Sequence, residues 1–351
     1  MLRFMAALFI LTFHYYDDAP TKVQIMEPLM KQGWLATNFF MMLSGLVMAR
    51  AYANNISEGH INFESFMLKR YARLIPSHAV VLIVFGIIIY GLTLFGFRPQ
   101  HPQAFTLHGW LEQLTLVYSW GFEDTPAWNL PTWTISSLLI CYAIYALVIG
   151  HLKKLSLGNL VVLLAVILIS ANLFSHYVFH RRMVELALQF SLGRAIPFFM
   201  MGVIAELMTR GLMVNKTQYF IWATTFLAGI IFFAYENTNS VFNDNAILLL
   251  TCAFMAISSR VTFNETTITK EMGKASYSLF LVHTPIQIIG FRILKIIEDR
   301  LHLPEIALWG IWFTMIAFSI AFAFMFQKYV DKPLSQITTK LLKRNRKVAI
   351  A

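Results

Sequence analysis

The stretch LRFMAALFILTFHYY, residues 2–16, places two ionisable side chains, Arg3 and His14, in an otherwise apolar segment. Eleven helical steps of about 100° return them to nearly the same face, and a rise of about 1.5 Å per residue separates them by about 16 Å along the axis. Ionisable groups at membrane depth are costly and are usually functional. The two residues cannot contact each other, but one elongated ligand can contact both.

The composition of the whole chain indicates a membrane protein. Of its 351 residues 58% are hydrophobic and 13% are charged, and the mean hydropathy is +0.62. A soluble protein carries about 25% charged residues, and several apolar runs here reach the ~20 residues that cross a bilayer. We predict an all-α, polytopic transmembrane helix bundle of about ten spans, at residues 4–16, 33–53, 75–96, 132–150, 157–174, 185–208, 218–235, 245–259, 275–296 and 306–327.

The distribution of charge predicts the orientation of these spans. With both termini in the cytoplasm, most of the 28 lysines and arginines fall on the cytoplasmic side, as the positive-inside rule requires. The net charge of +10 therefore indicates membrane orientation, and we expect no nucleic-acid partner. Residues 1–330 form one transmembrane domain in this interpretation, and residues 331–351 form a basic cytoplasmic tail that contacts anionic lipid.

Two alternatives concern the ends and the loops. The first apolar run is short, as in a secretory signal, but no small-residue cleavage site follows it and a histidine interrupts it. The longest stretches outside the spans, residues 54–74 and 97–131, are too short to fold as catalytic domains.

The two cysteines, Cys141 and Cys252, predict neither a disulfide framework nor a metal site. The chemistry is therefore expected within the membrane part.

Two motifs in the first quarter of the chain have both structural and functional interpretations. In FFMMLSGLVM, residues 39–48, the small pair Ser44 and Gly45 suits close helix packing. In KRYARLIP, residues 69–76 of the predicted cytoplasmic loop, Arg70 and Arg73 lie three residues apart and share a face if the segment is helical. Two guanidinium forks on one face suit phosphate oxygens, although a positive-inside anchor has the same pattern.

Two later motifs carry aromatic residues and a second histidine. In PAWNLPTWTIS, residues 126–136, Trp128 and Trp133 fit either an interfacial aromatic belt or a sugar-stacking surface. In GKASYSLFLVHTP, residues 273–285, His283 is a second intramembrane histidine and is followed by Pro285. A lone buried histidine is commonly a hydrogen-bonded packing residue, so this motif by itself does not indicate catalysis.

Taken together and in this order, the motifs resemble those of the integral-membrane acyltransferase family 3. The family pattern is an Arg/Lys-x10-His first helix, Phe-Phe-x-Leu-Ser-Gly, a cytoplasmic Arg-x-x-Arg, a Trp-Ser-Leu-Ser helix and Ser-Tyr-x-Leu-Tyr-Leu-x-His. The matching positions here are Arg3 with His14, residues 39–45, Arg70 with Arg73, residues 133–136 and residues 276–283. Two departures are Leu138, where the family often has a glutamate, and Phe280, where tyrosine is usual.

The resemblance implies an activity and a place for it. The family transfers an acyl group, usually acetyl from acetyl-CoA, to a hydroxyl of a cell-envelope carbohydrate such as lipopolysaccharide O-antigen or another exported polysaccharide, in the bacterial inner membrane. Acetyl-CoA, the carbohydrate and the lipid bilayer are then the partners. The implied site residues are His14 and Arg3 for catalysis, Arg70, Arg73 and Ser44 for the donor, and Trp128, Trp133, Ser276, Tyr277 and His283 for the acceptor.

The residue chemistry is compatible with this activity and leaves several alternatives open. Histidine titrates near pH 6.5, which suits a base that accepts the proton of a sugar hydroxyl. His14 acts either as that base or as a transiently acylated group, and Ser136 and Cys141 are alternative nucleophiles. A polysaccharide or lipid-linked sugar transporter, or a catalytically silent scaffold, would also have many spans. The sequence shows no internal repeat of the kind common in transporters.

Overall fold

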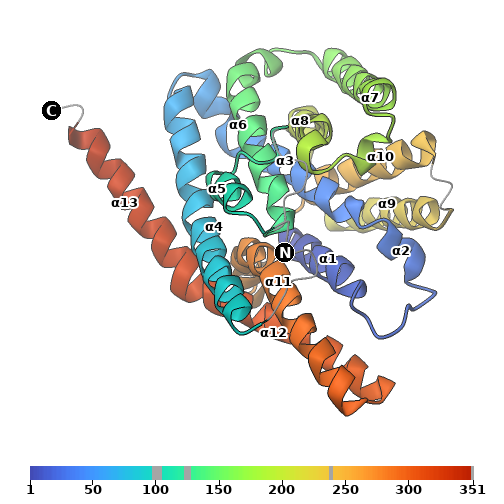
Figure 1. The fold of residues 1–351 in the computed structure, drawn as a ribbon. Coiled ribbons are helices and arrows are strands. Elements are labelled where there is room, and N and C mark those ends of the chain that lie inside the picture. Colours follow the sequence, from blue (N-terminus) through green and yellow to red (C-terminus); the bar gives the residue numbers. More distant parts are fainter. Residues whose placement is uncertain (97–104, 122–127, 237–239, 349–351) are drawn as a thin grey trace. The chain divides into compact units, whose positions relative to one another are not determined.

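Every regular element that the structure describes is a helix. The computed structural model describes residues 1–96, 105–121, 128–236 and 240–348 (Figure 1). The helices form two compact units. The first unit comprises Met1–Lys22, Leu68–Ser136 and Thr266–Ala351, and the second comprises Val23–Met67 and Ser137–Glu265. The predicted all-α class is confirmed.

Eight helical segments in the described ranges are long and apolar enough to cross a membrane. They are α4 (Phe63–Leu94), α6 (Trp133–Leu152) with the short turn before it, α7 (Leu157–Phe179), α8 (Leu192–Thr209), α9 (Lys216–Glu236), α10 (Val241–Ser258), α11 (Thr267–Leu301) and α12 (Glu305–Phe326) with the helix that continues it. Helix α1 (Leu2–Tyr16) is apolar but shorter. The chain is thus a multi-pass membrane protein, while the predicted count of ten spans and the orientation of the termini stay predictions.

The first unit is organised around α11. Helix α1 packs along α11, and α12 contacts both. An ideal Cβ on Gly273 would lie 3.9 Å from the nitrogen of Met1, whereas the rings of His14 and His283 are neighbours further along. Helices α1 and α11 therefore run side by side in the same direction.

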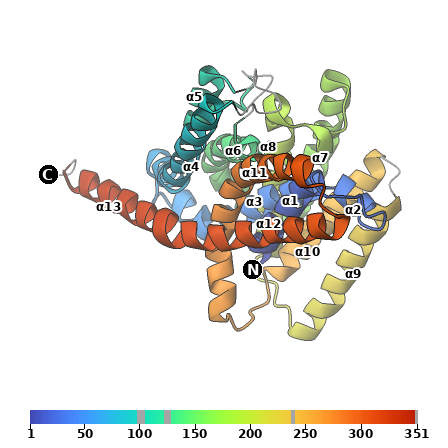
Figure 2. The same cartoon turned by 60° about the horizontal axis from the view of Figure 1, so that its bottom comes forward.

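Helix α12 does not end where the sequence predicts a change to a tail. It continues through a π-helical turn, η5 (Gln327–Asp331), into α13 (Lys332–Val348), as one long curved helix in Figure 2. The predicted boundary near residue 330 falls on this turn. A π-helical turn holds an extra residue and is often found at a functional site.

Helix α4 is longer than the predicted span. It begins at Phe63, so the segment with Arg70 and Arg73 is helical, and the expected loop over residues 54–74 is wrong for this part. The helix also continues through Pro76. A proline inside a helix removes one backbone hydrogen bond and causes a local clash, which α4 accommodates without ending. Arg70 and Arg73 therefore have the helical spacing on which the phosphate-binding interpretation depends.

The other connecting elements of the first unit are short. The long stretch after α4 contains α5 (Leu107–Thr115) and the 3₁₀ turn η2 (Leu130–Thr132), which leads directly into α6. Thr106 caps α5, since its hydroxyl accepts a hydrogen bond from the nitrogen of Gly109 at 3.0 Å. This arrangement places Trp110 against α4, where its Nε1 donates to the carbonyl of Leu82.

The second unit contains α2 (Glu27–Lys31), α3 (Trp34–Ser57), most of α6, and α7 to α10. Its tightest pair is α3 with α8. A Cβ added to Gly45 would lie 1.9 Å from the carbonyl oxygen of Phe199, and one added to Gly202 would lie 1.8 Å from that of Met42. Only glycine fits at both positions of this crossing, so the close-packing interpretation of the Ser44 and Gly45 pair is confirmed for Gly45.

Helix α8 starts later than the predicted span at residues 185–208. Two 3₁₀ turns, η3 (Met183–Glu185) and η4 (Leu188–Phe190), precede it. The buried guanidinium of Arg194 joins the segment before α8 to α3. It donates to the carbonyl of Leu186 at 3.2 Å. It also donates to Asn38 Oδ1 at 2.7 Å and to the carbonyl of Trp34 at 3.0 Å, both on α3. Arg194 is therefore a structural residue of the second unit.

Candidate functional site

Two histidines from different helices meet in the first unit. The ring centroids of His14, in the last turn of α1, and His283, in the middle of α11, are 5.4 Å apart. His283 is fully buried, whereas His14 is partly exposed. The described part of the chain offers the His14 ring no hydrogen bond, so its nitrogens are available to a ligand. The spacing of the two motifs along the sequence does not reveal this contact.

The hydrogen bonds of His283 define its protonation pattern. Its Nδ1 lies 3.2 Å from the carbonyl oxygen of Leu279, which can only accept, so Nδ1 carries the proton. Its Nε2 is then the acceptor for the hydroxyl of Thr284, also at 3.2 Å. This pattern assigns the tautomer from the network. His283 is thus a fixed, neutral ring against which His14 is positioned.

The end of α1 that carries His14 is fastened to α11 by Gln287. The amide nitrogen of Gln287 donates to the carbonyl of His14 at 2.8 Å and to the carboxylate of Asp18 at 2.7 Å. Partial desolvation raises the pKa of Asp18, and the hydrogen bond from Gln287 opposes this shift. Tyr15 adds a second attachment, since its hydroxyl donates to the carbonyl of His283 at 3.0 Å. These bonds determine where the imidazole of His14 lies.

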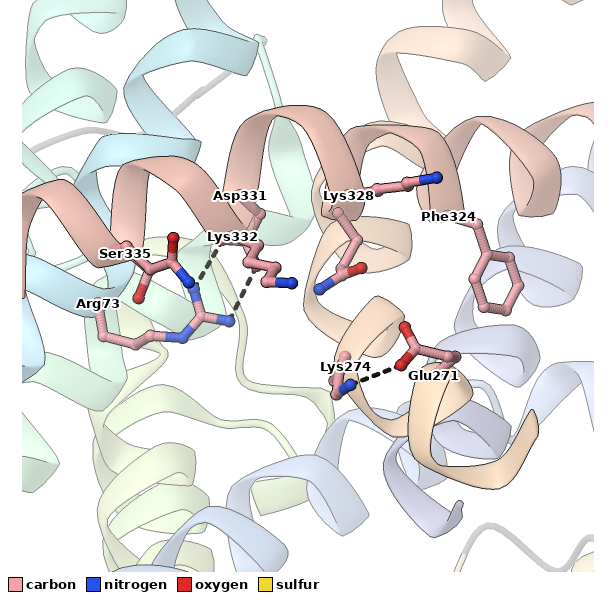
Figure 3. A pocket seen from close by; sticks show the side chains of 10 residues that line it. Arg73, Glu271, Lys274, Phe324, Lys328, Asp331, Lys332 and Ser335 are labelled. Atoms are coloured by element: carbon pink, nitrogen blue, oxygen red, sulfur yellow. Dashed lines mark hydrogen bonds and ion pairs between the residues drawn. The ribbon is translucent and has the colours of Figure 1, made fainter. Parts of the chain in front are cut away.

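A pocket of about 640 Å³ lies near the beginning of α11 (Figure 3). Its lining residues come from α4, α11, α12, the π-helical turn and α13. They are Arg73, Glu271, Lys274, Phe324, Gln327, Lys328, Asp331, Lys332, Ser335 and Gln336. The volume is in the range of small-molecule sites. Four cations and two carboxylates line it, so the pocket has a net positive charge and suits an anionic ligand.

Arg73 is held in this pocket by Asp331. The guanidinium forms a two-pronged ion pair with the carboxylate, at 2.7 and 3.0 Å (Figure 3). The hydroxyl of Ser77 donates to the same carboxylate at 2.6 Å. The ring of Tyr277 lies 5.0 Å from the guanidinium carbon, and its hydroxyl donates to the carbonyl of Leu74. Arg73 is therefore a positioned cation whose two terminal nitrogens both donate to Asp331.

The lysines of the pocket differ in their pairing. Lys274 pairs with Glu271 at 2.5 Å. Lys328 and Lys332 have no carboxylate partner within 4 Å among the described residues, and they lie about one turn apart on the same helix. Like charges at this separation repel each other. A phosphate bound between these two lysines would relieve that repulsion.

The histidine pair and the cationic pocket lie near opposite ends of α1, along the first half of α11. Lys274 and His283 are nine residues apart on α11, which corresponds to about 14 Å of rise. At the pocket end, Phe4 of α1 stacks against Phe324 at 5.8 Å between ring centroids. Arg3 lies in this first turn, away from His14, in agreement with the separation derived from the sequence.

The remaining predicted site residues are placed as follows. Arg70 is not among the residues that line the pocket, although it is three residues from Arg73. Ser276 is buried and donates to the carbonyl of Gly273 at 2.9 Å. Ser44 belongs to the second unit and donates to the carbonyl of Phe40 at 2.8 Å. Trp133 is buried at the start of α6. Their proposed roles stay predictions.

Trp128 is packed into an aromatic cluster. Its ring lies edge-on to Phe85 and Phe105, at 6.1 and 5.1 Å, and its Nε1 donates to the carbonyl of Thr106 at 3.0 Å. Only 8% of its surface is exposed. The two alternative nucleophiles are also buried, and the hydroxyl of Ser136 donates to the carbonyl of Leu116.

Several residues of the site were missed in the sequence. Asp331 and Lys332 fall in the predicted basic tail, Lys328 lies just before it, and the sequence gives no reason to single out Gln287. Arg73 and Asp331 are 258 residues apart, so no local pattern connects them. The available signal was an acidic residue among the lysines at the end of the last apolar run, in the stretch QKYVDK.

Fold and site define a class of protein: a helical, multi-pass membrane protein in which two parallel helices lie between a cationic pocket and a histidine pair. The model of the acyltransferase 3 family, described as an acyltransferase domain, matches residues 1–328. The chain belongs to this family, and the resemblance deduced from its motifs is confirmed.

The chain is similar to the acyltransferase MdmB of Streptomyces mycarofaciens, with 26% identity over 166 residues. The match covers 45% of this chain and 40% of that protein, so the chain spans less than half the length of this relative. No solved structure matches the chain.

Proposed function

We propose that the chain is a membrane O-acetyltransferase that moves an acetyl group from acetyl-CoA to a hydroxyl of a cell-envelope carbohydrate. Its membership of the acyltransferase 3 family supports the reaction class. The charge of the pocket favours a donor that carries phosphates. The carbohydrate acceptor and the bacterial inner membrane are what the resemblance of the motifs implies.

One observation carries the proposal: α1 and α11 run in parallel and connect a cationic pocket to a histidine pair. A CoA thioester has phosphates at one end and the reactive carbonyl at the other, separated by the flexible pantetheine arm. With the phosphates at Lys328 and Lys332, the arm would cover the offset of about 14 Å along α11 and present the carbonyl near His14. A ligand that is bound at one end by the pocket and at the other end by the histidine pair fits this arrangement. A neutral sugar carried by a transporter would have no use for a cationic pocket.

The proposed step is a direct transfer with His14 as the base. The acceptor oxygen attacks the thioester carbonyl while the imidazole of His14 takes the hydroxyl proton. A C–O bond forms, the C–S bond breaks, and His14 passes the proton to the departing thiolate, so that CoA leaves as a thiol. His283 keeps the ring of His14 in place, and Gln287 holds the end of α1. Base catalysis of this kind contributes about 10²- to 10⁴-fold.

Thioester cleavage tests the activity and distinguishes it from transport. The purified chain in lipid nanodiscs, supplied with acceptor membranes, is expected to release a free thiol from acetyl-CoA, measured with a thiol-reactive dye. A transporter should leave the thioester intact. Comparison of envelope glycans by NMR, with and without the gene, is expected to show the loss of an acetyl ester. Intact acetyl-CoA together with unchanged glycans would refute the proposal.

Replacing Lys328 and Lys332, which form no ion pair with the described carboxylates, is expected to weaken donor binding. We expect the Lys328→Gln, Lys332→Gln double variant to bind CoA about tenfold more weakly or worse, because hydrogen bonds to charged groups contribute about 1.5–3 kcal/mol each. Isothermal titration of the solubilised protein with CoA measures the change. The difference should shrink as salt is raised, since solvent-exposed charges are screened.

A matched control lies on the same helix. Lys340 is exposed on α13 and does not line the pocket, so Lys340→Gln should leave the affinity for CoA unchanged. Equal affinities of the double variant and the wild-type chain would remove the pocket from the donor site. Equal losses in the double variant and the control would indicate a general effect of net charge.

A further inference from the structure

Three fully buried polar side chains form a hydrogen-bonded series in the first unit. His78 of α4 donates from Nε2 to the carbonyl of Gln113 at 2.7 Å. The side-chain oxygen of Gln113 accepts from the backbone nitrogen of Asn129 at 2.9 Å. The side-chain nitrogen of Asn129 in turn donates to the carbonyl of Leu281 at 2.8 Å. The series therefore reaches α11 two residues before His283.

Each of these side chains keeps one polar atom that forms no hydrogen bond within the described chain: His78 Nδ1, Gln113 Nε2 and Asn129 Oδ1. The identity of these atoms is not arbitrary, because each partner is a backbone group that can only donate or only accept. Asn129 Oδ1 is therefore an acceptor and Gln113 Nε2 a donor, and the Nδ1 of a neutral His78 is an acceptor. Buried polar atoms are nearly always paired, so three unpaired ones in one series indicate a missing partner.

The donor and acceptor character of the three atoms indicates which chemical groups the missing partner carries. All three groups are neutral, and no lysine, arginine or carboxylate takes part in the series, in contrast to the cationic pocket. A hydroxyl group both donates and accepts, so hydroxyls can serve all three atoms: they can donate to Asn129 Oδ1 and His78 Nδ1 and accept from Gln113 Nε2. A sugar offers several hydroxyls on one small ligand.

The surroundings hold these groups in place. Trp128, next to Asn129, is fixed by Phe85 and Phe105 and by its bond to Thr106. Asn129 is itself the residue before η2, and its carbonyl accepts from the hydroxyl of Thr132 at 2.7 Å. Ser278, one turn before Leu281 on α11, has a further buried hydroxyl without a partner among the described residues.

We propose that His78, Gln113 and Asn129 form a subsite that binds sugar hydroxyls of the acceptor. This inference rests on the proposed function for its role in the reaction, since the subsite contacts α11 beside His283. It assigns these three residues to acceptor recognition and leaves Trp128 the task of positioning Asn129. The competing explanation is that the three atoms bind only internal water.

Gln113→Glu is the sharpest test, because it keeps the oxygen that accepts from Asn129 and replaces only the unpaired nitrogen. A panel of methyl glycosides of common envelope sugars serves as the probe. We expect at least one glycoside to raise the melting temperature of the solubilised wild-type chain. In Gln113→Glu the concentration needed for half of that shift should rise at least tenfold, while the affinity for CoA stays within twofold.

A matched control and a second variant complete the design. Gln218 also accepts a hydrogen bond from a backbone nitrogen, that of Asn215, but is exposed in the second unit. Gln218→Glu should therefore respond to glycosides like the wild-type chain. If Gln113→Glu does not fold, His78→Gln replaces it, because glutamine can keep a donor at the position of Nε2 while removing the Nδ1 acceptor.

The outcomes separate the subsite from the proposed activity. If no glycoside shifts the wild-type melting temperature, or if Gln113→Glu responds like the control, the three atoms bind water and the subsite is refuted. If glycosides bind with the expected variant effect but acetyl-CoA is not cleaved, the subsite stands and the acetyltransferase proposal fails.

Discussion

A His14→Ala chain is expected to lose acyl transfer by about 10²- to 10⁴-fold, which is the usual contribution of a positioned acid–base group. The imidazole contacts His283 at 5.4 Å, and the described residues leave its nitrogens free to accept a proton from a substrate. The variant should still fold, because the bond that fastens this end of α1 uses the backbone carbonyl of His14 and not its ring. Thiol release from acetyl-CoA in the presence of acceptor membranes measures the loss.

A second histidine provides the control for this experiment. His176 is exposed on α7 in the second unit, so His176→Ala should retain full activity. CoA affinity should be unchanged in both variants, since the phosphates are proposed to bind at the other end of α11. Full activity of His14→Ala at a normal protein level would refute the role of His14 as the base, and with it the direct transfer proposed above.

The helical fold could be predicted from the sequence because its signal is local. Apolar runs of about 20 residues must form helices in a membrane, where every backbone polar group needs an internal partner. The edges were less predictable. Helix α4 continues through Pro76. Helix α8 begins only at Leu192, and Arg194 in its first turn donates hydrogen bonds to the carbonyls of Leu186 and Trp34.

Some residues of the candidate site could be predicted from the sequence and others could not, for a physical reason. His14 and His283 could be found because ionisable residues in apolar surroundings stand out in a sequence. Arg73 could be found because its spacing from Arg70 places two guanidinium groups on one helical face. Asp331 was missed, because its partner Arg73 comes close only in the folded chain. Gln113 and Asn129 were missed for a different reason. Amides outside the apolar spans are common, and only their complete burial, with one atom that has no partner among the described residues, makes these two unusual.

Gly202→Ala is expected to destabilise the second unit strongly. The added Cβ would lie 1.8 Å from the carbonyl oxygen of Met42, a backbone atom of α3 that cannot rotate away as a side chain could. Helices α3 and α8 must therefore move apart, and Gly45 on the facing helix would lose its close contact with Phe199. Overpacking of a well-packed core costs about 1–3 kcal/mol, occasionally more. Close approach of backbones is also what holds helices together in a membrane.

Gly150→Ala is the matched control, because a Cβ on this glycine of α6 meets no atom within 4 Å. Alanine is about 0.8–1.0 kcal/mol better than glycine inside a helix, so this variant should be as stable as the wild-type chain or more so. Thermal unfolding in detergent compares the three proteins. A melting temperature of Gly202→Ala equal to that of Gly150→Ala would contradict the tight crossing of α3 and α8. A lower melting temperature in Gly202→Ala alone would support the tight crossing to which Gly45 also belongs. Ser44 is not needed for this crossing. Its proposed role in donor binding is therefore tested by Ser44→Ala, which leaves the crossing intact.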